Sequence, residues 1–355
     1  MYASNSMEYL AELLAGNIRK AEGPVFGKIH LVTQTAGMSA WLKDQLAREN
    51  RVFANFEILN QEKLFSEVYR AMFGEYPANT RDLVKYRIYD LLEDDDFTSE
   101  HVEVADYYEG NDLRRFQLAE RVADLFDQYQ IYRPVIIAGW DKGKFDVDRP
   151  NEAWQCWLWQ RLKLESRVET RERMYEKMKG SGEILKENFP HISLFGISVY
   201  TEFHLEFFHE LARFTRVDFY LNLPNLEKEY RNELLQSFGF KARELTGFFE
   251  NAEFSKRDLA GETLLGGVQK QILENRPVSA LEEDGSVEVN SCHTPAREVE
   301  CVYNYLLDLF DRQPDMEPSQ VLIMCSDISR YAPLVKAVFR NAPVKLPFEV
   351  SGMAR

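Results

Sequence analysis

Paired cysteines and long apolar runs are both missing from this 355-residue sequence. Its four cysteines show no CxxC spacing, and neither a secretory signal nor a membrane-spanning run is found. A disulfide framework would need clustered cysteines, and a membrane span would need an unbroken apolar segment. The sequence therefore predicts a soluble, cytoplasmic protein with reduced thiols.

The signature of ATP binding is missing as well. A nucleotide-binding domain would place GxxxxGK[ST] at the strand-loop-helix start of the chain, where SNSMEYL stands instead. Without glycines the backbone N–H groups cannot wrap phosphates, and without the lysine nothing reaches the terminal phosphate. The acidic pair that would follow a strand near Phe195 is also absent. We therefore expect that the protein binds neither ATP nor any other cofactor.

Catalytic and metal-binding patterns are not found either. The GIS triplet at 196–198 resembles a nucleophile elbow, but Tyr200 replaces the second glycine and no histidine is placed to pair with the serine. His204 and His209 lie five residues apart, off the four-residue spacing that puts two ligands on one helix face. We expect both to be ordinary helix residues, and we expect neither catalytic residues nor a metal site.

Positive charge is scarce, since the formal net charge is -15. A general nucleic-acid coat protein is disfavoured, because non-specific affinity comes from neutralised phosphates. The negative charge is not spread evenly over the chain, however, because residues 90–112 alone contain ten acidic residues and no Lys or Arg. This acidic segment is suited to docking a basic partner, so a generic protein-interaction module is one reading of the chain.

Residues 28–47 combine an apolar strand, a polar turn and an amphipathic helix. The strand contains Ile29, Leu31 and Val32, and the turn at 33–37 reads TQTAG. In an α/β protein such a turn lies at the carboxyl end of the sheet, where ligands usually bind. The turn offers hydroxyls and the amide of Gln34. Its helix is predicted from apolar residues at helical spacing, namely Met38, Trp41, Leu42 and Leu46.

Strand and helix patterns alternate in two separated parts of the chain. Short strands are predicted at 52–59, 191–198 and 217–223, with helix caps at Asn60 and Thr201. Between them the strand signal disappears, and helices are predicted at 80–92, 113–132 and 151–179. A run of helices inside an α/β pattern is typical of an inserted helical domain.

A linker at 281–286 separates a further α/β unit. Its strands are predicted at 287–291 and 321–325, and its helices begin after Thr294, with Pro295 at the first position, and after Asp327. The unit looks cut off at the end of the chain. The predicted organisation is one α/β domain formed by 1–74 and 183–284, a helical insertion at 75–182, and the start of a second α/β domain at 285–355.

Two helical segments of the insertion carry candidate binding residues. In the helix 113–132, Asp124, Asp127 and Gln128 flank or oppose an apolar stripe formed by Phe116, Ala119, Val122, Ala123, Phe126 and Tyr129. These carboxylates either face a partner or hold Arg114, Arg121 or Arg133 in structural pairs. The helix 151–179 is the most basic in an acidic chain. It includes Arg171, and it is the best candidate for contacting phosphates or planar bases.

Seven segments together resemble one family. They are SNSMEYL, QTAGMSAWL, ADLFDQYQIYRP, AWQCWLW, FGIS, CHTPAREVE and YAPLVKAVF. In this order they resemble the N-terminal portion of the RecC family, the gamma subunits of exodeoxyribonuclease V (the RecBCD helicase-nuclease). The resemblance implies a P-loop NTPase-like, superfamily 1 helicase fold that has lost its ATPase motifs. It also implies a non-catalytic scaffold that splits duplex DNA, scans the 3′ strand for the hotspot Chi, and binds the helicase-nuclease beta subunit and the motor alpha subunit.

The resemblance also assigns a Chi-reading surface. The positions that match it are Gln34, Asp124, Leu125, Asp127, Gln128, Arg133 and Arg171. Unstacked bases can be read on their edges by carboxylates, amides and arginine. Four positions depart from the best-known members: Ala36 and Ala40 replace polar residues, and Asn60 and Ser66 replace apolar ones. The hotspot that this chain reads is therefore expected to differ in sequence.

Two other classes of function remain open at this point. The first is an ATP-driven helicase or nuclease that is active by itself, for which ATPase activity or a bound nucleotide would speak. The second is the interaction module suggested by the acidic segment. Co-purification with a helicase-nuclease chain separates the scaffold subunit from both.

Overall fold

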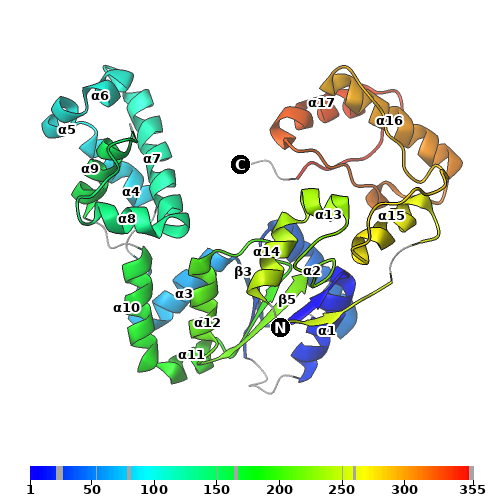
Figure 1. The fold of residues 1–355 in the computed structure, drawn as a ribbon, viewed down its shortest axis with the longest axis horizontal. Helices are drawn as coiled ribbons and strands as arrows, with labels where there is room; N and C mark the ends of the chain where they lie inside the picture. Colours follow the sequence, from blue (N-terminus) through cyan, green and yellow to red (C-terminus); the bar gives the residue numbers. More distant parts are fainter. Residues whose placement is uncertain are drawn as a thin grey trace. The chain divides into compact units, whose positions relative to one another are not determined.

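The computed structural model describes residues 1–20, 27–52, 54–77, 81–149, 151–163, 167–249, 251–258 and 261–351. Contacts divide the chain into two compact units, Met1–Leu281 and Glu282–Arg355. Figure 1 shows their helices and strands. In the described ranges, no helix is both long and apolar enough to cross a membrane.

A six-stranded sheet forms the centre of the first unit (Figure 1). Its order is β3-β2-β4-β5-β1-β6, and every pairing is parallel, as the sequence predicted. The strands are β1 (Tyr2–Ser4), β2 (Ile29–Val32), β3 (Phe56–Leu59), β4 (His191–Phe195), β5 (Arg216–Asn222) and β6 (Glu253–Ser255). Strand β1 is the strand expected at the strand-loop-helix start of the chain, whereas β6 has no predicted counterpart, because a segment of three residues is too short to show an alternating pattern.

Helices cover both faces of this sheet, because its strands carry apolar side chains on both sides. One face packs on α1 (Met7–Lys20) and α2 (Ala36–Asn50) through Leu31 and Phe195. The other face packs through Val32 and Leu194 on a larger group of helices. This group contains α3 (Gln61–Phe73), α10 (Arg167–Lys179), α11 (Gly182–Asn188), α12 (Glu202–Leu211) and α14 (Phe240–Phe248). Helix α13 (Glu233–Phe238) and helix α15 (Leu264–Leu273) complete the unit.

The helical segment within the first unit has a hydrophobic core of its own, built around Phe126, Trp140 and Trp159. Its helices are α4 (Arg81–Leu91), α5 (Asp95–Glu100), α6 (Val102–Tyr108), α7 (Asp112–Tyr132), α8 (Pro134–Trp140) and α9 (Glu152–Leu162). Helix α7 follows the predicted stripe, since Ala119, Val122, Ala123 and Phe126 are buried. The first residue predicted for α4, Thr80, lies outside the described residues.

The single helix predicted over 151–179 is wrong. Helix α9 ends at Leu162, and Lys163 then adopts a left-handed backbone conformation with φ of 48°. Residues 164–166 lie outside the described ranges, and α10 begins at Arg167. Because a left-handed residue cannot continue a right-handed helix, α9 ends at this position, and neither a glycine nor a proline signals the end in the sequence.

Two predicted strands are longer than the observed ones. Strand β3 covers only Phe56–Leu59 of the range 52–59, because Asn55 has a φ of 60° that interrupts the extended chain. Strand β4 ends at Phe195, because Gly196 has a φ of 61°. A Cβ added to Gly196 would lie 2.9 Å from Met7 Cε, so this turn also needs the space that glycine leaves.

The second unit contains α16 (Pro295–Arg312), the short 3₁₀ helix η1 (Pro318–Gln320) and α17 (Ile328–Asn341). Thr294 and Asp327 cap the two long helices as predicted. The strands predicted at 287–291 and 321–325 are wrong, since no strand forms among described residues 282–351. The side chains of Val289, Leu322 and Met324 are largely exposed. An apolar run becomes a strand only when a neighbouring strand satisfies its backbone groups.

Candidate functional site

The carboxyl edge of the sheet contains a topological switch point between β2 and β4. The chain leaves β2 toward β3 on one side and leaves β4 toward β5 on the other, so the two connections diverge. Ligands of open α/β sheets usually bind in the crevice that such a divergence creates. The loops that follow β2 and β4 therefore form the first place to search for a site.

The loop after β1 is where an NTPase would hold phosphates. Here Ser4 Oγ donates to the carbonyl oxygen of Ser255 at 2.7 Å and accepts the Ser6 N–H at 3.2 Å. The Asn5 side chain exchanges two hydrogen bonds with the backbone of Arg257, both 2.7 Å long. Because the loop is closed by its own side chains and by the segment after β6, it is not an open cradle of N–H groups.

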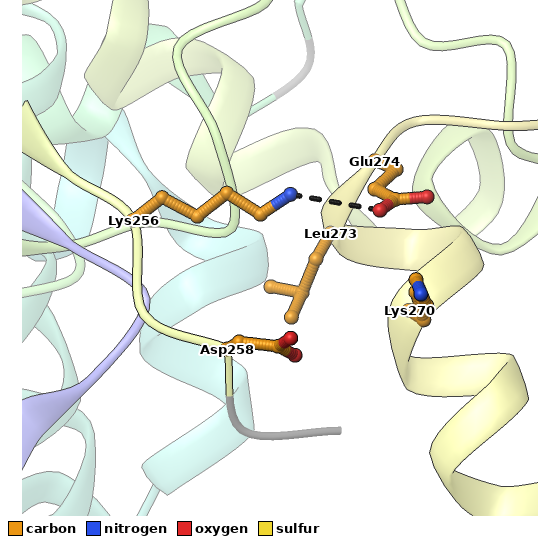
Figure 2. Close-up of a pocket in the computed structure, with 5 residues that line it drawn as sticks. All are labelled: Lys256, Asp258, Lys270, Leu273 and Glu274. Carbon is orange, nitrogen blue, oxygen red and sulfur yellow. Dashed lines mark ion pairs between the residues drawn. The ribbon is translucent and has the colours of Figure 1, made fainter. Parts of the chain in front are cut away.

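A pocket of about 260 Å³ lies beside the segment that follows β6 (Figure 2). Its walls are Lys256, Asp258, Lys270, Leu273 and Glu274. The Lys256 ammonium lies 3.7 Å from the Glu274 carboxylate. Two lysines are thus balanced by two carboxylates, so the pocket lacks the excess positive charge that a phosphate group requires.

At the switch point, Gln34 lies directly against the loop after β4. Its side-chain oxygen accepts the backbone N–H of Ser198 at 3.1 Å and the Ser198 hydroxyl at 3.0 Å. Gln34 is exposed and stands just before α2, which Thr35 caps. Since the Ser198 hydroxyl is bound to an amide oxygen, no base activates it as a nucleophile.

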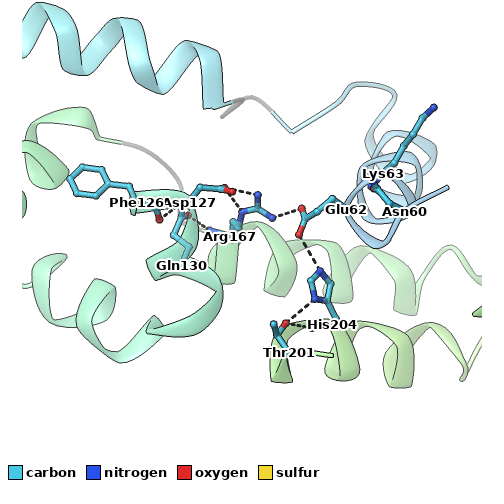
Figure 3. A network of polar contacts seen from close by, with 9 residues as sticks. All are labelled: Asn60, Glu62, Lys63, Phe126, Asp127, Gln130, Arg167, Thr201 and His204. Carbon is cyan, nitrogen blue, oxygen red and sulfur yellow. Dashed lines mark hydrogen bonds and ion pairs between the residues drawn. The ribbon is translucent and has the colours of Figure 1, made fainter. Parts of the chain in front are cut away.

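A chain of charged and polar groups joins α7 to the helices under the carboxyl edge (Figure 3). Arg167, at the start of α10, donates to Asp127 Oδ1 of α7 from Nε at 3.0 Å and from Nη2 at 2.5 Å. Its Nη1 donates to Glu62 of α3 at 2.5 Å. Glu62 in turn binds His204 Nε2 at 3.1 Å, and His204 Nδ1 lies 2.8 Å from the Thr201 hydroxyl. We call these five residues the Arg167 network.

Contacts within the Arg167 network favour the ionised forms of Glu62 and Arg167. Burial opposes ionisation of Glu62, but the bond from His204 and the charge of Arg167 outweigh it and lower the pKa of Glu62 to about 2. His204 thus lies between two polar groups, because its Nε2 faces this carboxylate and its Nδ1 faces the Thr201 hydroxyl, which also accepts the backbone N–H of His204. Burial disfavours the Arg167 charge, yet the carboxylates of Glu62 and Asp127 raise its pKa. The network is thus a stably ionised link between helices far apart in sequence.

The lowered pKa predicts a pH dependence that can be measured. A carboxylate whose pKa falls on folding stabilises the folded state above its ordinary pKa, and this contribution is lost as pH falls toward the folded value. As pH falls from about 5 to about 2, wild type should progressively lose its stability advantage over Glu62→Gln, as measured by urea unfolding. Parallel pH profiles for the two proteins would contradict this account of Glu62.

The remaining predicted site residues on α7 lie near its carboxyl half. Asp124 accepts a hydrogen bond from Gln128 at 3.2 Å and lies 3.4 Å from Arg81. Gln128 is exposed, and Leu125 is half-buried. Arg133 is exposed, with its guanidinium 5.7 Å from the centre of the Tyr129 ring. The carboxylates of Asp124 and Asp127 therefore pair with Arg81 and Arg167, not with the arginines that the sequence suggested.

Arg171 lies one helical turn beyond Arg167 on α10. It forms an ion pair with Glu206 of α12, and its guanidinium lies 5.0 Å from the centre of the Phe203 ring. The structure therefore brings Asp124 and Gln128 together, and it connects Asp127 to the sheet helices through Arg167. Gln34 and Arg171 belong to other contacts within the first unit.

Sequence reasoning missed the role of three network members. The sequence pattern does not distinguish Glu62 or Arg167 from the other charged residues around them, and it predicts that His204 is an ordinary helix residue. The contacts join residues 40, 105 and 142 positions apart. No local spacing could reveal them, although an ionisable residue in the first turn of a helix, as Glu62 is, is a weak signal of a charge interaction.

A metal site is not formed in the described part of the chain, where no group of three or more His, Cys, Asp or Glu side chains converges. A comparison with protein families decides the wider relationship. The family described as "RecC, N-terminal domain" matches residues 1–275. The chain belongs to the RecC family.

Individual RecC proteins support this assignment. The chain is 25% identical to "RecBCD enzyme subunit RecC" of Haemophilus influenzae, over 99% of this chain and 40% of that protein. It is 24% identical to the Escherichia coli protein of the same name, over 99% of this chain and 39% of that protein. A Mycobacterium tuberculosis relative is 30% identical over 64% of this chain and 24% of its own length. The predicted resemblance to RecC is confirmed, and the chain spans about 40% of the first two relatives.

Proposed function

We propose that this chain is part of a non-catalytic, DNA-binding scaffold subunit of a RecBCD-type exodeoxyribonuclease V that acts in double-strand break repair by homologous recombination. The observation that carries the proposal is the switch point of the parallel sheet, which presents the Gln34 amide where other α/β folds bind ligands. The Arg167 network links α7 to helices α3 and α12 of the sheet layer. A strand of DNA is the ligand that family membership suggests.

We further propose that the parallel sheet is a superfamily 1 helicase-like domain that has lost its ATPase motifs. The closed loop at Ser4–Ser6 supports the loss, because its polar groups already have partners. In this scheme 1–74 and 183–284 form the first domain, 75–182 the helical insertion, and 285–355 the start of a second domain. The separate hydrophobic core around Phe126 and Trp140 supports the proposal that 75–182 form an inserted domain.

The proposed reading surface consists of Gln34, Asp124, Leu125, Asp127, Gln128, Arg133 and Arg171. Asp124 and Gln128 support it best, because both lie on α7 opposite its buried stripe. Amide and carboxylate groups can distinguish bases through their hydrogen-bonding edges. We propose that this surface scans single-stranded DNA, in a cytoplasmic complex with the helicase-nuclease beta subunit and the motor alpha subunit.

The loss of the phosphate loop predicts that the protein does not bind ATP. Calorimetric titration with ATP and magnesium should give no binding heat, because the loop lacks the glycine N–H groups and the lysine that bind the phosphates of ATP. A chain with an intact GxxxxGK[ST] loop provides the positive control. Micromolar affinity that is lost when Asn5 is changed to Ala would instead favour an active motor.

The scaffold role is tested by reconstituting the full-length subunit with its beta and alpha partners. We expect the three chains to co-purify and the complex to change its degradation of DNA at a defined sequence. Co-purification without any sequence-dependent change would reduce the chain to an interaction module. ATPase activity in the subunit alone would favour the alternative of an ATP-driven helicase or nuclease that is active by itself.

A further inference from the structure

Two cysteines of the second unit lie in direct contact at the start of α16. Cys292 stands two residues before Thr294, the residue that caps this helix, and Cys301 lies in its second turn. The Cys292 thiol donates a hydrogen bond to Cys301 Sγ, and the two sulfur atoms are 3.5 Å apart. Both thiols are free and both residues are partly exposed. A small reagent in solution can therefore reach the pair.

The other two cysteines of the chain are placed differently. Cys156 is 2% exposed in the core of the helical insertion, and burial raises the pKa of its thiol. Such a thiol is inert, because the thiolate is the reactive form. Cys325 is exposed, but the sulfur contact that the described residues contain joins Cys292 to Cys301. The pair is thus distinguished by contact and access together.

Packing of the hydrophobic core does not explain why the two thiols meet. Among described residues 282–351, the core is built around Val299, Tyr303, Leu306 and Phe339, and neither cysteine belongs to it. Cys301 is two residues from Val299 and two from Tyr303, which places it about 200° around the helix from this buried stripe. The contact between the thiols therefore lies outside the core.

The geometry of the pair suits a disulfide. The sulfur atoms of a disulfide are about 2.0 Å apart, so this pair would have to close by about 1.5 Å, which is within the reach of side-chain rotation. The hydrogen bond with Cys301 raises the pKa of the Cys292 thiol, and the charge of Arg297 opposes this rise. The pair thus keeps its protons at neutral pH and reacts through a small thiolate fraction.

We propose that Cys292 and Cys301 form a reversible oxidation site, for which a low-molecular-weight disulfide such as glutathione disulfide is the oxidant. The thiolate of one cysteine attacks a sulfur of the oxidant, releases one small thiol and forms a mixed disulfide. The thiolate of the other cysteine then displaces the second small thiol. The two protein thiols lose two protons and two electrons in total, and the oxidant is reduced to two thiols. In a reducing compartment the pair stays a dithiol, and it closes when the small disulfide accumulates.

The disulfide would act as a clamp on the start of α16. It closes the loop 292–301, which contains the cap residue Thr294 and the first turn of the helix. A closed loop has fewer open conformations, so the first turn should open less often in the oxidised protein. The inference goes beyond the proposed function, since neither cysteine belongs to the proposed reading surface.

The test treats the purified full-length subunit with glutathione disulfide and then alkylates the remaining thiols. Trypsin cleaves after Arg297, so Cys292 lies in the tryptic peptide 271–297 and Cys301 in the peptide 298–312. We expect mass spectra to show these two peptides joined, and dithiothreitol to separate them. The joined pair should exceed any pair that includes Cys325 by about tenfold or more, because thiols in contact have a high effective concentration.

Serine variants and hydrogen exchange complete the test. Cys292→Ser and Cys301→Ser should each abolish the joined pair, whereas Cys325→Ser, at an exposed position of the same unit, should retain it. The backbone N–H groups of Arg297 and Glu298 are bound by Thr294. Their exchange should slow by about tenfold or more when wild type is oxidised, and it should not change in Cys301→Ser.

Two results would overturn the proposal. The first is a treated protein without the joined peptides, whether or not it carries glutathione on single cysteines. The second is a joined pair that leaves hydrogen exchange at the start of α16 unchanged, which would reject the clamp. Neither result would affect the proposed function, because the reconstituted complex tests that function separately.

Discussion

Replacing Arg167 with methionine is expected to lower the free energy of unfolding by about 2 kcal/mol. The substitution keeps most of the side-chain volume but leaves the carboxylates of Glu62 and Asp127 without their shared cation. The Arg167 side chain is 25% exposed, so solvent relieves part of the penalty that a fully buried charge would bring. Urea unfolding of the chain measures the effect.

Lys177→Met is the control, since Lys177 is an exposed cation on the same helix. We expect it to change stability by less than about 0.5 kcal/mol. A double-mutant cycle between Arg167→Met and Asp127→Asn should show coupling, because the two groups are in direct contact. Equal losses for the two methionine variants, or additive effects in the cycle, would mean that the network contributes little.

Changing Asp124 or Gln128 to alanine should shift the DNA sequence at which the reconstituted complex responds. A hydrogen-bonded base contact contributes about 1 to 3 kcal/mol of discrimination, which is a change in preference of roughly tenfold or more. Both side chains bond to each other and lie near the surface of α7, so their loss should affect stability only slightly. Hotspot mapping and thermal melting of the same variants measure both effects.

Asp127→Ala is expected to behave differently from these two. It removes the partner of Arg167 and should therefore lower the melting temperature as well as alter recognition. Glu120→Ala, an exposed acidic position on the same helix, is the control for loss of charge. If all of these variants keep the wild-type hotspot, the carboxylates and the amide serve structure alone, and the reading surface is wrongly assigned.

Local chemistry explains why the sequence predicted many elements correctly. Asn60, Thr201, Thr294 and Asp327 cap helices as expected, because a short polar side chain can satisfy the free N–H groups of the first turn. The buried stripe of α7 follows from helical periodicity within one segment. The polar turn after β2 lies at the carboxyl edge because parallel strands place all such turns there.

By itself, then, the sequence determined the parallel α/β class, the helical run within it, most helix starts and the RecC family. The tertiary structure alone decided the contacts that join distant segments: the pairing of Asp127 with Arg167, and the contact of His204 with Glu62. It also decided that 287–291 and 321–325 form no strands. Caps and periodicity act over a few neighbouring residues, whereas ion pairs, pockets and strand pairing depend on which distant groups the folded chain brings within bonding distance.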